Sequence, residues 1–445
     1  MPPLTLSKKM IRRKISVITL GCSKNTVDTE HLLSMLPEDA FDISDGCGQH
    51  LDCLLVNTCG FIGDAKEESV QTILEAVEKK KSKDIDRIVV FGCLSQRYSD
   101  ELPGEIPEVD AWFGARDLKP VAEYLCRTFG VEARREPSPL RRFLPSSYAY
   151  LKISEGCDRR CSYCAIPHIR GPHRSVPMED ILKEARELVA AGARELILIA
   201  QDTTYYGLDI YHKRSLAELL RRLSEIERLE WIRIHYSYPD DFPEDVLDEM
   251  AENPKVCKYL DIPLQHISDT VLDNMRRHID GKWTRELIAR MRERVPGVSL
   301  RTTLIVGHPG EGDKEFDELM EFVGNARFER LGAFQYSEED GTWGAAHLED
   351  DVPSEVKSSR YERLMELQAE ISLEHNVSRV GTDEKVLVDA VGDGYFVCRS
   401  QYESPEVDGE IIVPVVEGVS VGDFIKVHIT EADYYDLRGE YIGKF

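Results

Sequence analysis

The sequence predicts an α/β protein with three parts: a doubly wound parallel sheet, a partial or complete β/α barrel, and a small antiparallel β-barrel. Three observations support this. The 445 residues exceed what a single ordinary core holds. Short apolar runs alternate with helical patterns, and after a long helix the pattern changes to short runs separated by Gly and Asp. The expected boundaries are 12–129, a linker at 130–147, 148–376, and 378–445.

The amino-terminal part contains three apolar runs that are predicted to be strands: ISVITL, LDCLLVN and RIVVFG, beginning at Ile15, Leu51 and Arg87. Residues 26–36 and 64–80 between them have helical spacing. Strands that alternate with helices of this length favour a parallel sheet with helices on both faces. The stretch VEARREPSPLRRFLPSS that follows is rich in Arg, Pro and Ser, which is typical of a linker.

The middle part repeats the alternation with longer units. Six runs are predicted to be strands: YAYLKIS, ELILIA, WIRIHY, KYLDIP, LRTTLIVG and LGAFQYS. In the first helix Ile181, Ala185, Leu188 and Val189 form one apolar stripe, which Gly192 is placed to end. Six such units fit a partial or complete β/α barrel, whose active site is expected at the carboxyl ends of the strands. A long helix at about 354–376 leads out of it.

The last part is predicted to be a small antiparallel β-barrel and is acidic. The runs KVLVDAV, YFVCRS, EIIVPVV and DFIKVHI alternate in character and are separated by Gly and Asp turns. Val380 to Phe445 contain 14 Asp or Glu against 5 Lys or Arg, a net charge of −9 within a chain of −25. This balance disfavours unassisted binding to phosphate backbones and favours a basic partner.

The cysteines indicate metal rather than disulfides. The chain has 11, an odd number, and its basic opening is followed by an apolar run shorter than the core of a secretory signal. We therefore expect a cytoplasmic protein, with no membrane association, whose thiols are reduced. Clustered thiols in that compartment indicate metal binding.

Three cysteines form a compact motif after the first predicted barrel strand. Cys157, Cys161 and Cys164 lie in SEGCDRRCSYCAIP, so that one loop can bring three thiolates to one metal centre. A 4Fe–4S cluster with three protein ligands leaves one iron open, whereas a closed structural site uses four. An open iron can chelate S-adenosylmethionine and deliver an electron to its sulfonium, the cofactor supplying the difficult chemistry. The alternative is a structural zinc site with His168 or His173 as fourth ligand.

Three further cysteines share one topological position. Cys22, Cys59 and Cys93 each follow a predicted parallel strand. Loops at the carboxyl ends of adjacent strands share one edge of a sheet, so these thiols can converge. We predict a second 4Fe–4S cluster here, again with one iron free. The remaining cysteines, Cys47, Cys53, Cys126, Cys257 and Cys398, are predicted to be packing residues.

The first cysteine loop resembles that of the radical S-adenosylmethionine superfamily. The resemblance implies that Tyr163, before the last cysteine, lies by the adenine of the cofactor. It also implies that the strand and turn TTLIVGHPGE, with Gly307 and Gly310, flank S-adenosylmethionine. A Gly-x-Pro-Gly turn is also common in ordinary loops.

From about Ile15 to its end the chain resembles the methylthiotransferases. The motifs are GCSKN, NTCGFI, SEGC-x3-C-x2-CAIP and IPLQHISD, and the last part resembles a TRAM domain. The resemblance implies that the barrel cluster generates a radical and that the amino-terminal cluster holds the sulfur to be inserted. One S-adenosylmethionine would supply the methyl group and another the radical.

This family has two branches, one acting on adenosine in tRNA and one on an aspartate of ribosomal protein S-twelve of the small subunit. IAQDTTYYG, YSEEDGT and SQYESPEVDG resemble the second branch. A tail of net charge −9 would also repel tRNA and attract a basic ribosomal protein. The resemblance therefore implies methylthiolation of the aspartate β-carbon, in the free protein or the 30S subunit. Flavodoxin or ferredoxin would supply electrons. A tRNA methylthiotransferase and a zinc-binding scaffold without catalysis are the alternatives.

Two positions depart from the family pattern. Val176 stands where relatives usually carry Arg, and His308 replaces an expected Phe. Hydrogen-atom transfer demands no acid or base at the carbon, so no general base is predicted. Several polar residues lie in loops near the predicted site but have surface or structural roles as their default: Glu155, Arg174, Gln201, Asp202 and His266.

Overall fold

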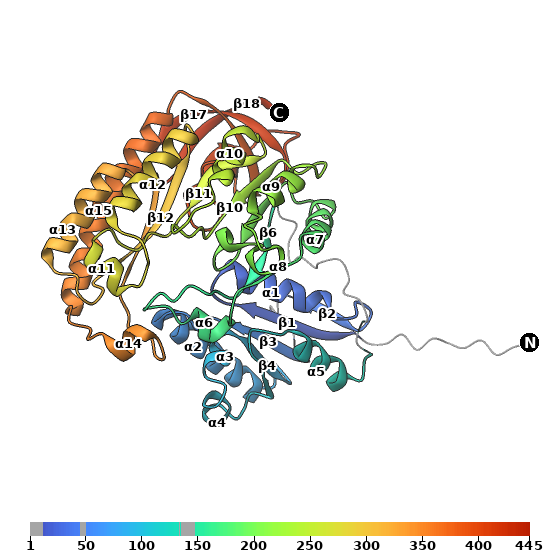
Figure 1. Ribbon diagram of the computed structural model, residues 1–445. Coiled ribbons are helices and arrows are strands. Elements are labelled where there is room, and N and C mark those ends of the chain that lie inside the picture. The colour runs from blue at the N-terminus through green and yellow to red at the C-terminus, as the bar shows by residue number, and fades with distance from the viewer. Residues whose placement is uncertain (1–11, 45–49, 133, 135–146) are drawn as a thin grey trace, which may run out of the picture. The chain divides into compact units, whose positions relative to one another are not determined.

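The computed structural model describes residues 12–44, 50–132, 134 and 147–445, whose helices and strands are shown in Figure 1. Residues 1–143 together with 168–171 form one unit, and residues 144–167 together with 172–445 form the other. Cys47 and most of the predicted linker at 130–147 lie outside the described residues.

The first unit contains a five-stranded parallel sheet with the strand order β2-β1-β3-β4-β5. Its strands are β1 (Arg13–Thr19), β2 (Phe41–Ser44), β3 (Cys53–Thr58), β4 (Ile88–Gly92) and β5 (Ala111–Trp112). The three predicted strands, β1, β3 and β4, are its central members. The edge strands β2 and β5 were not predicted, because four and two residues are too few to show a periodic pattern.

Helices cover both faces of this sheet, as predicted. They are α1 (Ser23–Ser34), α2 (Gly63–Lys81), α3 (Cys93–Arg97), α4 (Leu102–Glu105) and α5 (Lys119–Phe129). Alternate residues of β3 point to opposite faces: Cys53 and Leu55 pack with α1 and α5, whereas Leu54 and Val56 pack with α2. Each face of the sheet is thus packed against its own hydrophobic core.

The second unit contains a six-stranded parallel sheet with the order β13-β12-β11-β10-β9-β6. Its strands are β6 (Tyr148–Lys152), β9 (Glu195–Ile199), β10 (Trp231–Ile234), β11 (Val256–Asp261), β12 (Ser299–Val306) and β13 (Arg330–Gln335). These are the six predicted strands. The sheet is open, so the barrel is partial rather than complete. A short antiparallel pair, β7 (Ser154–Glu155) with β8 (Arg174–Ser175), follows β6.

Helices alternate with these strands. The main ones are α7 (Met178–Ala190), α9 (Leu216–Ser224), α10 (Glu244–Glu252), α12 (Gly281–Arg294), α13 (Asp313–Ala326) and α15 (Ser354–Arg379). The short ones are α6 (Ile166–Arg170), α8 (Leu208–Tyr211), α11 (Asp269–Asn274), α14 (Trp343–His347) and the 3-10 helix η1 (Thr203–Tyr205). The predicted apolar stripe of α7 is buried. In the described part of the chain, no helix has the length and apolar character needed to span a membrane.

The chain ends in a closed five-stranded barrel with the order β14-β15-β16-β18-β17. Its strands are β14 (Asp383–Val391), β15 (Tyr395–Arg399), β16 (Ile411–Pro414), β17 (Phe424–Ala432) and β18 (Leu437–Lys444). Four pairings are antiparallel as predicted, but β16 pairs with β18 in parallel. This correction has a geometric reason: a closed ring with an odd number of strands cannot alternate direction at every step.

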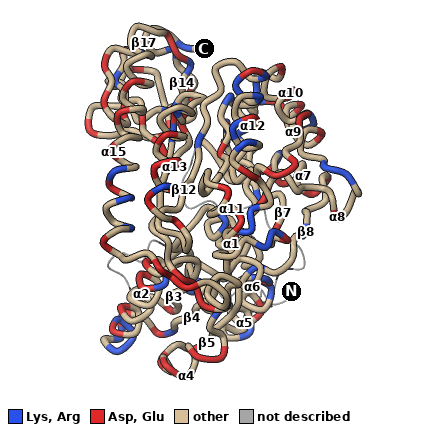
Figure 2. Tube along the Cα trace, turned by 60° about the vertical axis from the view of Figure 1, so that its left-hand side comes forward, with Lys and Arg blue, Asp and Glu red and all other residues tan. Residues whose placement is uncertain are grey.

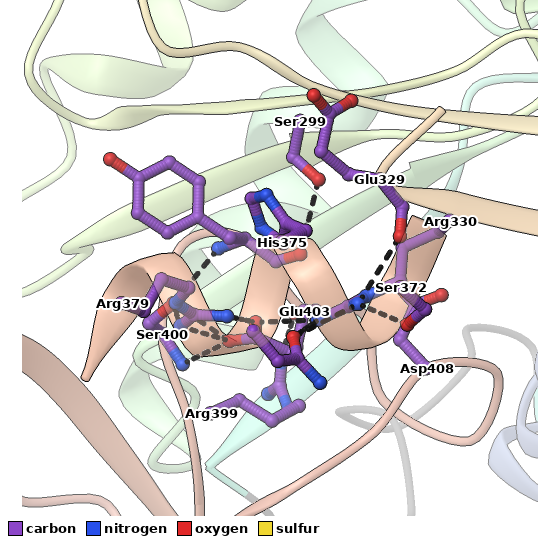
Figure 3. A network of polar contacts seen from close by, with 12 residues as sticks. Ser299, Glu329, Arg330, Ser372, His375, Arg379, Arg399, Ser400, Glu403 and Asp408 are labelled. Carbon is purple, nitrogen blue, oxygen red and sulfur yellow. Dashed lines mark hydrogen bonds and ion pairs between the residues drawn. The ribbon is translucent and has the colours of Figure 1, made fainter. Parts of the chain in front are cut away.

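Buried ion pairs fix this barrel to the rest of the second unit (Figure 3). Glu403 accepts hydrogen bonds from Arg379 at the end of α15 and from Arg330 in β13. Glu195 in β9 accepts from Arg233 in β10 at 2.7 Å and from Arg399 in β15 at 2.8 Å. Because every partner is buried, each charge depends on the others for compensation.

Candidate cluster sites

The three amino-terminal cysteines follow three neighbouring strands. Cys22 comes after β1 and is the N-cap of α1, Cys59 follows β3, and Cys93 is the first residue of α3 after β4. Since β1, β3 and β4 are adjacent and parallel, all three thiols lie at the same edge of the sheet. The strands thus place the three cysteines at one edge of the sheet, and their joint ligation of a cluster stays a prediction.

Two glycines let these loops pack closely. A Cβ atom on Gly21 would lie 2.7 Å from the Cβ of Cys59 and 2.9 Å from its Sγ, and its φ of +87° is the left-handed region that favours glycine. A Cβ on Gly60 would lie 2.7 Å from the Cα of Leu94. The loop of Cys22 thus contacts that of Cys59, which in turn contacts that of Cys93.

A buried arginine, Arg170, completes this edge. It lies in the segment 168–171 that belongs to the first unit, and it is 2% exposed. Its guanidinium donates to Asp28 at 2.6 Å, to Asn25 Oδ1 at 2.6 Å and to Cys93 Sγ at 3.1 Å. The amide of Asn25 also donates to the carbonyls of Leu20 and Thr58. Arg170 and Asn25 therefore join the cysteine loops into one polar cluster.

The electrostatics of this edge suit thiolates only in part. Burial raises the pKa of Cys93 to about 12, while the Arg170 cation acts in the opposite direction. Burial likewise raises the pKa of Cys59. A metal ligand must be a thiolate, so the Arg170 cation favours the ligating form of Cys93. Three thiolates and the single Arg170 cation would leave a net negative charge at this edge. A cluster whose iron–sulfur core is positively charged would balance it.

The second cysteine loop is held by two backbone contacts. It contains Cys157, Cys161 and Cys164 and runs from β7 to α6. The backbone N–H of Ser162 donates to the carbonyl of Met275 at 3.0 Å, and that of Gly344 donates to the carbonyl of Ser162 at 2.7 Å. Burial raises the pKa of Cys157 to about 12 and raises that of Cys164.

Two arginines sandwich Tyr238 beside this loop. Arg159, between the first two cysteines, stacks 4.0 Å from the ring of Tyr238 and pairs with Asp202 and Asp240 at 3.0 and 2.8 Å. Arg277 stacks 4.2 Å from the same ring. Its guanidinium also lies 3.5 Å from Cys161 Sγ and 3.4 Å from Tyr163 Oη. The hydroxyl of Tyr238 lies 3.7 Å from Cys161 Sγ.

Buried polar atoms without partners gather near the carboxyl ends of the barrel strands. Five side-chain atoms follow five adjacent strands and have no hydrogen-bond partner among the described residues: Ser154 Oγ, Gln201 Oε1, Ser237 Oγ, Gln265 Oε1 and His308 Nε2. An unpaired buried polar atom costs about 1–3 kcal/mol, so a row of them indicates a polar ligand that pairs with them. S-adenosylmethionine has the required amino, carboxylate and ribose groups.

Three of the other polar loop residues, Glu155, Asp202 and His266, contact polar or charged side chains of the protein. Glu155 accepts from Gln201 at 2.8 Å and from Lys152 at 2.7 Å. Asp202 caps η1 through Thr204 and pairs with Arg159. His266 lies 3.2 Å from Glu311, and Arg174 is exposed on β8. Asp202 is thus held by protein contacts, whereas one side-chain oxygen of Gln201 has no partner among the described residues.

The residues predicted to contact S-adenosylmethionine, Tyr163, Gly307 and Gly310, lie near His308 at one end of this row. The half-buried ring of Tyr163 lies 6.3 Å from that of His308 in an edge-to-face arrangement. Gly307 and Gly310 have φ values of +74° and +86°. A Cβ on Gly307 would lie 2.3 Å from the side chain of Lys357. The backbone conformation and this close approach already require glycine at Gly307, so cofactor contact there stays a prediction.

The zinc alternative requires several ligating side chains around one metal ion. Within residues 12–44, 50–132, 134 and 147–445, no group of three or more His, Cys, Asp or Glu side chains is arranged to hold one metal ion. His173, an alternative fourth zinc ligand, has its Nε2 3.0 Å from the hydroxyl of Ser175. A four-iron cluster is larger than one ion and keeps its thiolates further apart, so this finding concerns the zinc alternative alone.

Family models match all three parts of the chain. Residues 14–114 match the uncharacterized protein family UPF0004, residues 151–323 the radical SAM superfamily, and residues 380–442 the TRAM domain. The chain is 51% identical over 436 residues to the "Ribosomal protein uS12 methylthiotransferase RimO" of Porphyromonas gingivalis, covering 96% of this chain and 99% of that one. It is 48% identical to the protein of that name from Bacteroides thetaiotaomicron, covering 98% and 100%. The chain belongs to the ribosomal protein uS12 methylthiotransferase family.

Solved structures support the fold of this methylthiotransferase family member. The radical S-adenosylmethionine methyltransferase TsrM from Kitasatospora setae has a TM-score of 0.58 at 14% identity, covering 93% of this chain and 84% of that chain. At this identity the likeness shows the fold alone. The prediction from the motifs, a radical SAM methylthiotransferase of the ribosomal-protein branch, is confirmed at the level of the family.

Sequence reasoning missed the arginines of both cysteine sites. Arg170 and Arg277 lie 77 and 116 positions from the thiols that they contact. No local spacing connects residues so far apart. The one available signal was that Arg170 and Arg277 both follow cysteine-rich or polar motifs. Such a motif indicates that the segment is important, but it does not identify the thiol that the arginine contacts.

Proposed function

We propose that this chain methylthiolates the β-carbon of an aspartate in ribosomal protein uS12, the S-twelve protein of the small subunit. The observation that carries the proposal is the 48–51% identity over at least 96% of the chain to proteins that bear this name. The similarity spans the sheet with Cys22, the partial barrel and the TRAM domain. A match to only one of these parts would support a much broader functional assignment.

Cys157, Cys161 and Cys164 are assigned to a 4Fe–4S cluster with an open iron, and Cys22, Cys59 and Cys93 to a second one. When bound, the first cluster supplies one-electron cleavage of S-adenosylmethionine, and the second holds the sulfur for transfer. The chain supplies the thiolates, and Arg170 favours the ionised form of Cys93.

The partial barrel orients S-adenosylmethionine. Gln201, Gln265 and His308 offer unpaired buried atoms at the carboxyl ends of β9, β11 and β12. His308 is neutral at pH 7, since its pKa is lowered to about 4 mainly by burial, so Nε2 can accept or donate depending on the tautomer. Tyr163 covers the adenine, with Gly307 and Gly310 as flanking backbone.

The TRAM domain attracts a basic partner. Figure 2 shows acidic residues distributed along its tube, in line with its net charge of −9. Complementary charge speeds the encounter with a basic ribosomal protein and disfavours tRNA. The electron donor is a low-potential one-electron carrier such as flavodoxin or ferredoxin. Because ribosomal subunits are the source of the substrate, we place this reaction in the cytoplasm.

The test uses anaerobically reconstituted protein with S-adenosylmethionine, a reductant and a sulfide source. Purified uS12, 30S subunits and unmodified tRNA are offered in parallel and analysed by mass spectrometry. A methylthio group on an aspartate of uS12 is the expected result. The same group on an adenosine would overturn the substrate, and stoichiometric zinc in place of iron would overturn the reaction. The variant Cys161→Ala should abolish cleavage of S-adenosylmethionine, whereas Cys257→Ala, a buried cysteine of β11 remote from both sets in sequence, should retain it.

A further inference from the structure

Arg277, a buried cation of the second unit, has no acidic partner among the described residues. Seven arginines are buried in the described part of the chain. Six form ion pairs with Asp or Glu: Arg170, Arg233, Arg330, Arg360, Arg379 and Arg399. Arg277, 3% exposed, forms none among the described residues.

The remaining contacts of Arg277 do not neutralise it. One arm donates to the carbonyl of Pro263, the other lies between Tyr163 Oη and Cys161 Sγ, and Nε has no partner among the described residues. The ring of Tyr238 offers a cation–π contact at 4.2 Å. Cation–π stacking contributes about 2 kcal/mol or more when desolvated, which is less than the several kcal/mol that burying an ion costs. Among the described residues, Arg277 is therefore a buried cation that no protein anion neutralises.

The anion is available at the nearest sulfur. Cys161 becomes a thiolate when it ligates iron, and two more thiolates arrive with Cys157 and Cys164 on the same loop. A cluster with three thiolate ligands becomes more negative by one charge when it is reduced. A cation 3.5 Å from one ligand in a buried site stabilises the reduced form more than the oxidised form.

We propose that Arg277 is the counter-ion of the barrel cluster, raising the potential at which this cluster accepts one electron from a low-potential carrier. The inference rests on the proposed ligation by Cys157, Cys161 and Cys164. Arg277 acts through Cys161 and is a positioning residue rather than a catalytic one. Its neighbour Arg159 differs, because Asp202 and Asp240 already neutralise it. The two arginines that sandwich Tyr238 thus have different roles, one structural and one electrostatic.

The experiment measures the midpoint potential of the barrel cluster alone. Full-length protein with Cys22→Ala, Cys59→Ala and Cys93→Ala is reconstituted, so that one cluster remains, and is titrated with dithionite and mediators by EPR. Arg277→Met should make the cluster at least tenfold harder to reduce, a shift of about 59 mV to lower potential for one electron. Arg277→Lys should recover part of the shift. The control is Arg285→Met, an exposed residue of α12 paired with Glu318 at 3.2 Å, which should leave the potential unchanged.

Melting temperatures give a second reading. If Arg277 compensates the cluster, loading iron should raise the melting temperature more in the protein with Arg277 than in Arg277→Met. If Arg277 were purely structural, Arg277→Met would lower the melting temperatures of the apo and iron-loaded forms equally. An unchanged potential in a fully loaded Arg277→Met protein would overturn the inference. So would equal failure of the Met and Lys variants to fold or to load iron, since charge would then not be the property that matters.

Failure of this inference is distinguishable from failure of the proposed function. If the protein with intact Arg277 holds no 4Fe–4S cluster at the barrel site, the proposed ligation fails. If that cluster is present but its potential does not respond to Arg277, only the counter-ion role fails.

Discussion

Arg170 donates a hydrogen bond to Cys93 Sγ at 3.1 Å, and its other arm is fixed by Asp28 at 2.6 Å. One fully buried guanidinium thus serves a carboxylate and a thiol together. The arrangement contrasts with Arg277, which reaches a thiol without any carboxylate among the described residues. Asp28 therefore neutralises Arg170 before any metal arrives, and the amino-terminal edge can be stable as an apoprotein.

We expect Arg170→Met to destabilise the first unit by about 3–5 kcal/mol, because Asp28 is left buried without this cation. The double variant Arg170→Met, Asp28→Leu should recover most of that loss. Neither variant should load the amino-terminal cluster fully, since Cys93 loses its cation in both. Urea unfolding of the apoprotein and iron content measure the two effects separately. Full loading in the double variant would show that Arg170 acts on the fold and not on the thiol.

Glu403 is predicted to be the critical charge at the junction of the TRAM domain (Figure 3). It is 1% exposed and accepts from Arg379 and Arg330. Glu403→Gln should cost about 3–5 kcal/mol of unfolding free energy, because two buried arginines lose their shared anion. The exposed Glu417→Gln should change it by less than about 0.5 kcal/mol. Trp231 fluorescence can report the transition, since its ring lies 4.8 Å from that of Phe424 across the junction.

The pH dependence of Glu403 has a definite sign. Burial alone would raise its pKa, but Arg379 and Arg330 hold the pKa well below the usual range for glutamate. A carboxylate with a lowered pKa in the folded state stabilises the protein above the pKa of the unfolded state and loses that contribution as the pH falls. Glu403→Gln should therefore be destabilised most at neutral pH, and the gap to the parent protein should narrow below about pH 4.5. A gap that widened with acid would contradict the ion-pair explanation.

Much of the fold could be predicted because buried parallel strands read as continuous apolar runs. The six strands of the partial barrel and the three central strands of the first sheet all have this signature. The edge strands β2 and β5 have too few residues to show it. The parallel pairing of β16 with β18 could not be read from strand character, because it arises from closure of a five-stranded ring.

The cysteines could be predicted, but their electrostatic environment could not. Cys157, Cys161 and Cys164 form a local motif, and Cys22, Cys59 and Cys93 share a position relative to their strands. The cations that face them come from other segments and meet the thiols only through tertiary packing. The same applies to the unpaired atoms of Ser237 and Gln265, which are ordinary polar residues until the strands place them in one buried row.

His308 should make stability sensitive to mild acid. Its pKa is lowered to about 4, mainly by burial, while the unfolded value is about 6.5. The unfolded chain therefore takes up the proton first, and stability falls between pH 6.5 and 4, by about 2 kcal/mol at pH 5 from this group. His308→Phe, the residue expected from relatives, should remove that loss. Urea unfolding at pH 7 and pH 5 measures it. His375, with its pKa also lowered to about 4, is present in both proteins, so the difference isolates His308.

The acidic surface of the TRAM domain should govern capture of uS12 without affecting the chemistry. Asp393, Glu417, Glu431 and Glu440 are exposed on its loops and strands. Changing all four to lysine should weaken binding of uS12 by roughly tenfold or more and reduce its salt dependence, because the attraction between opposite charges is removed. Uncoupled cleavage of S-adenosylmethionine should continue at the parent rate, because the four residues lie in the TRAM domain and none belongs to the loop of Cys157, Cys161 and Cys164. The matched control changes Asp393 to Asn and the three glutamates to Gln, and it should give an intermediate affinity. Loss of both binding and cleavage would indicate misfolding of the unit, and loss of neither would place the docking surface outside the TRAM domain.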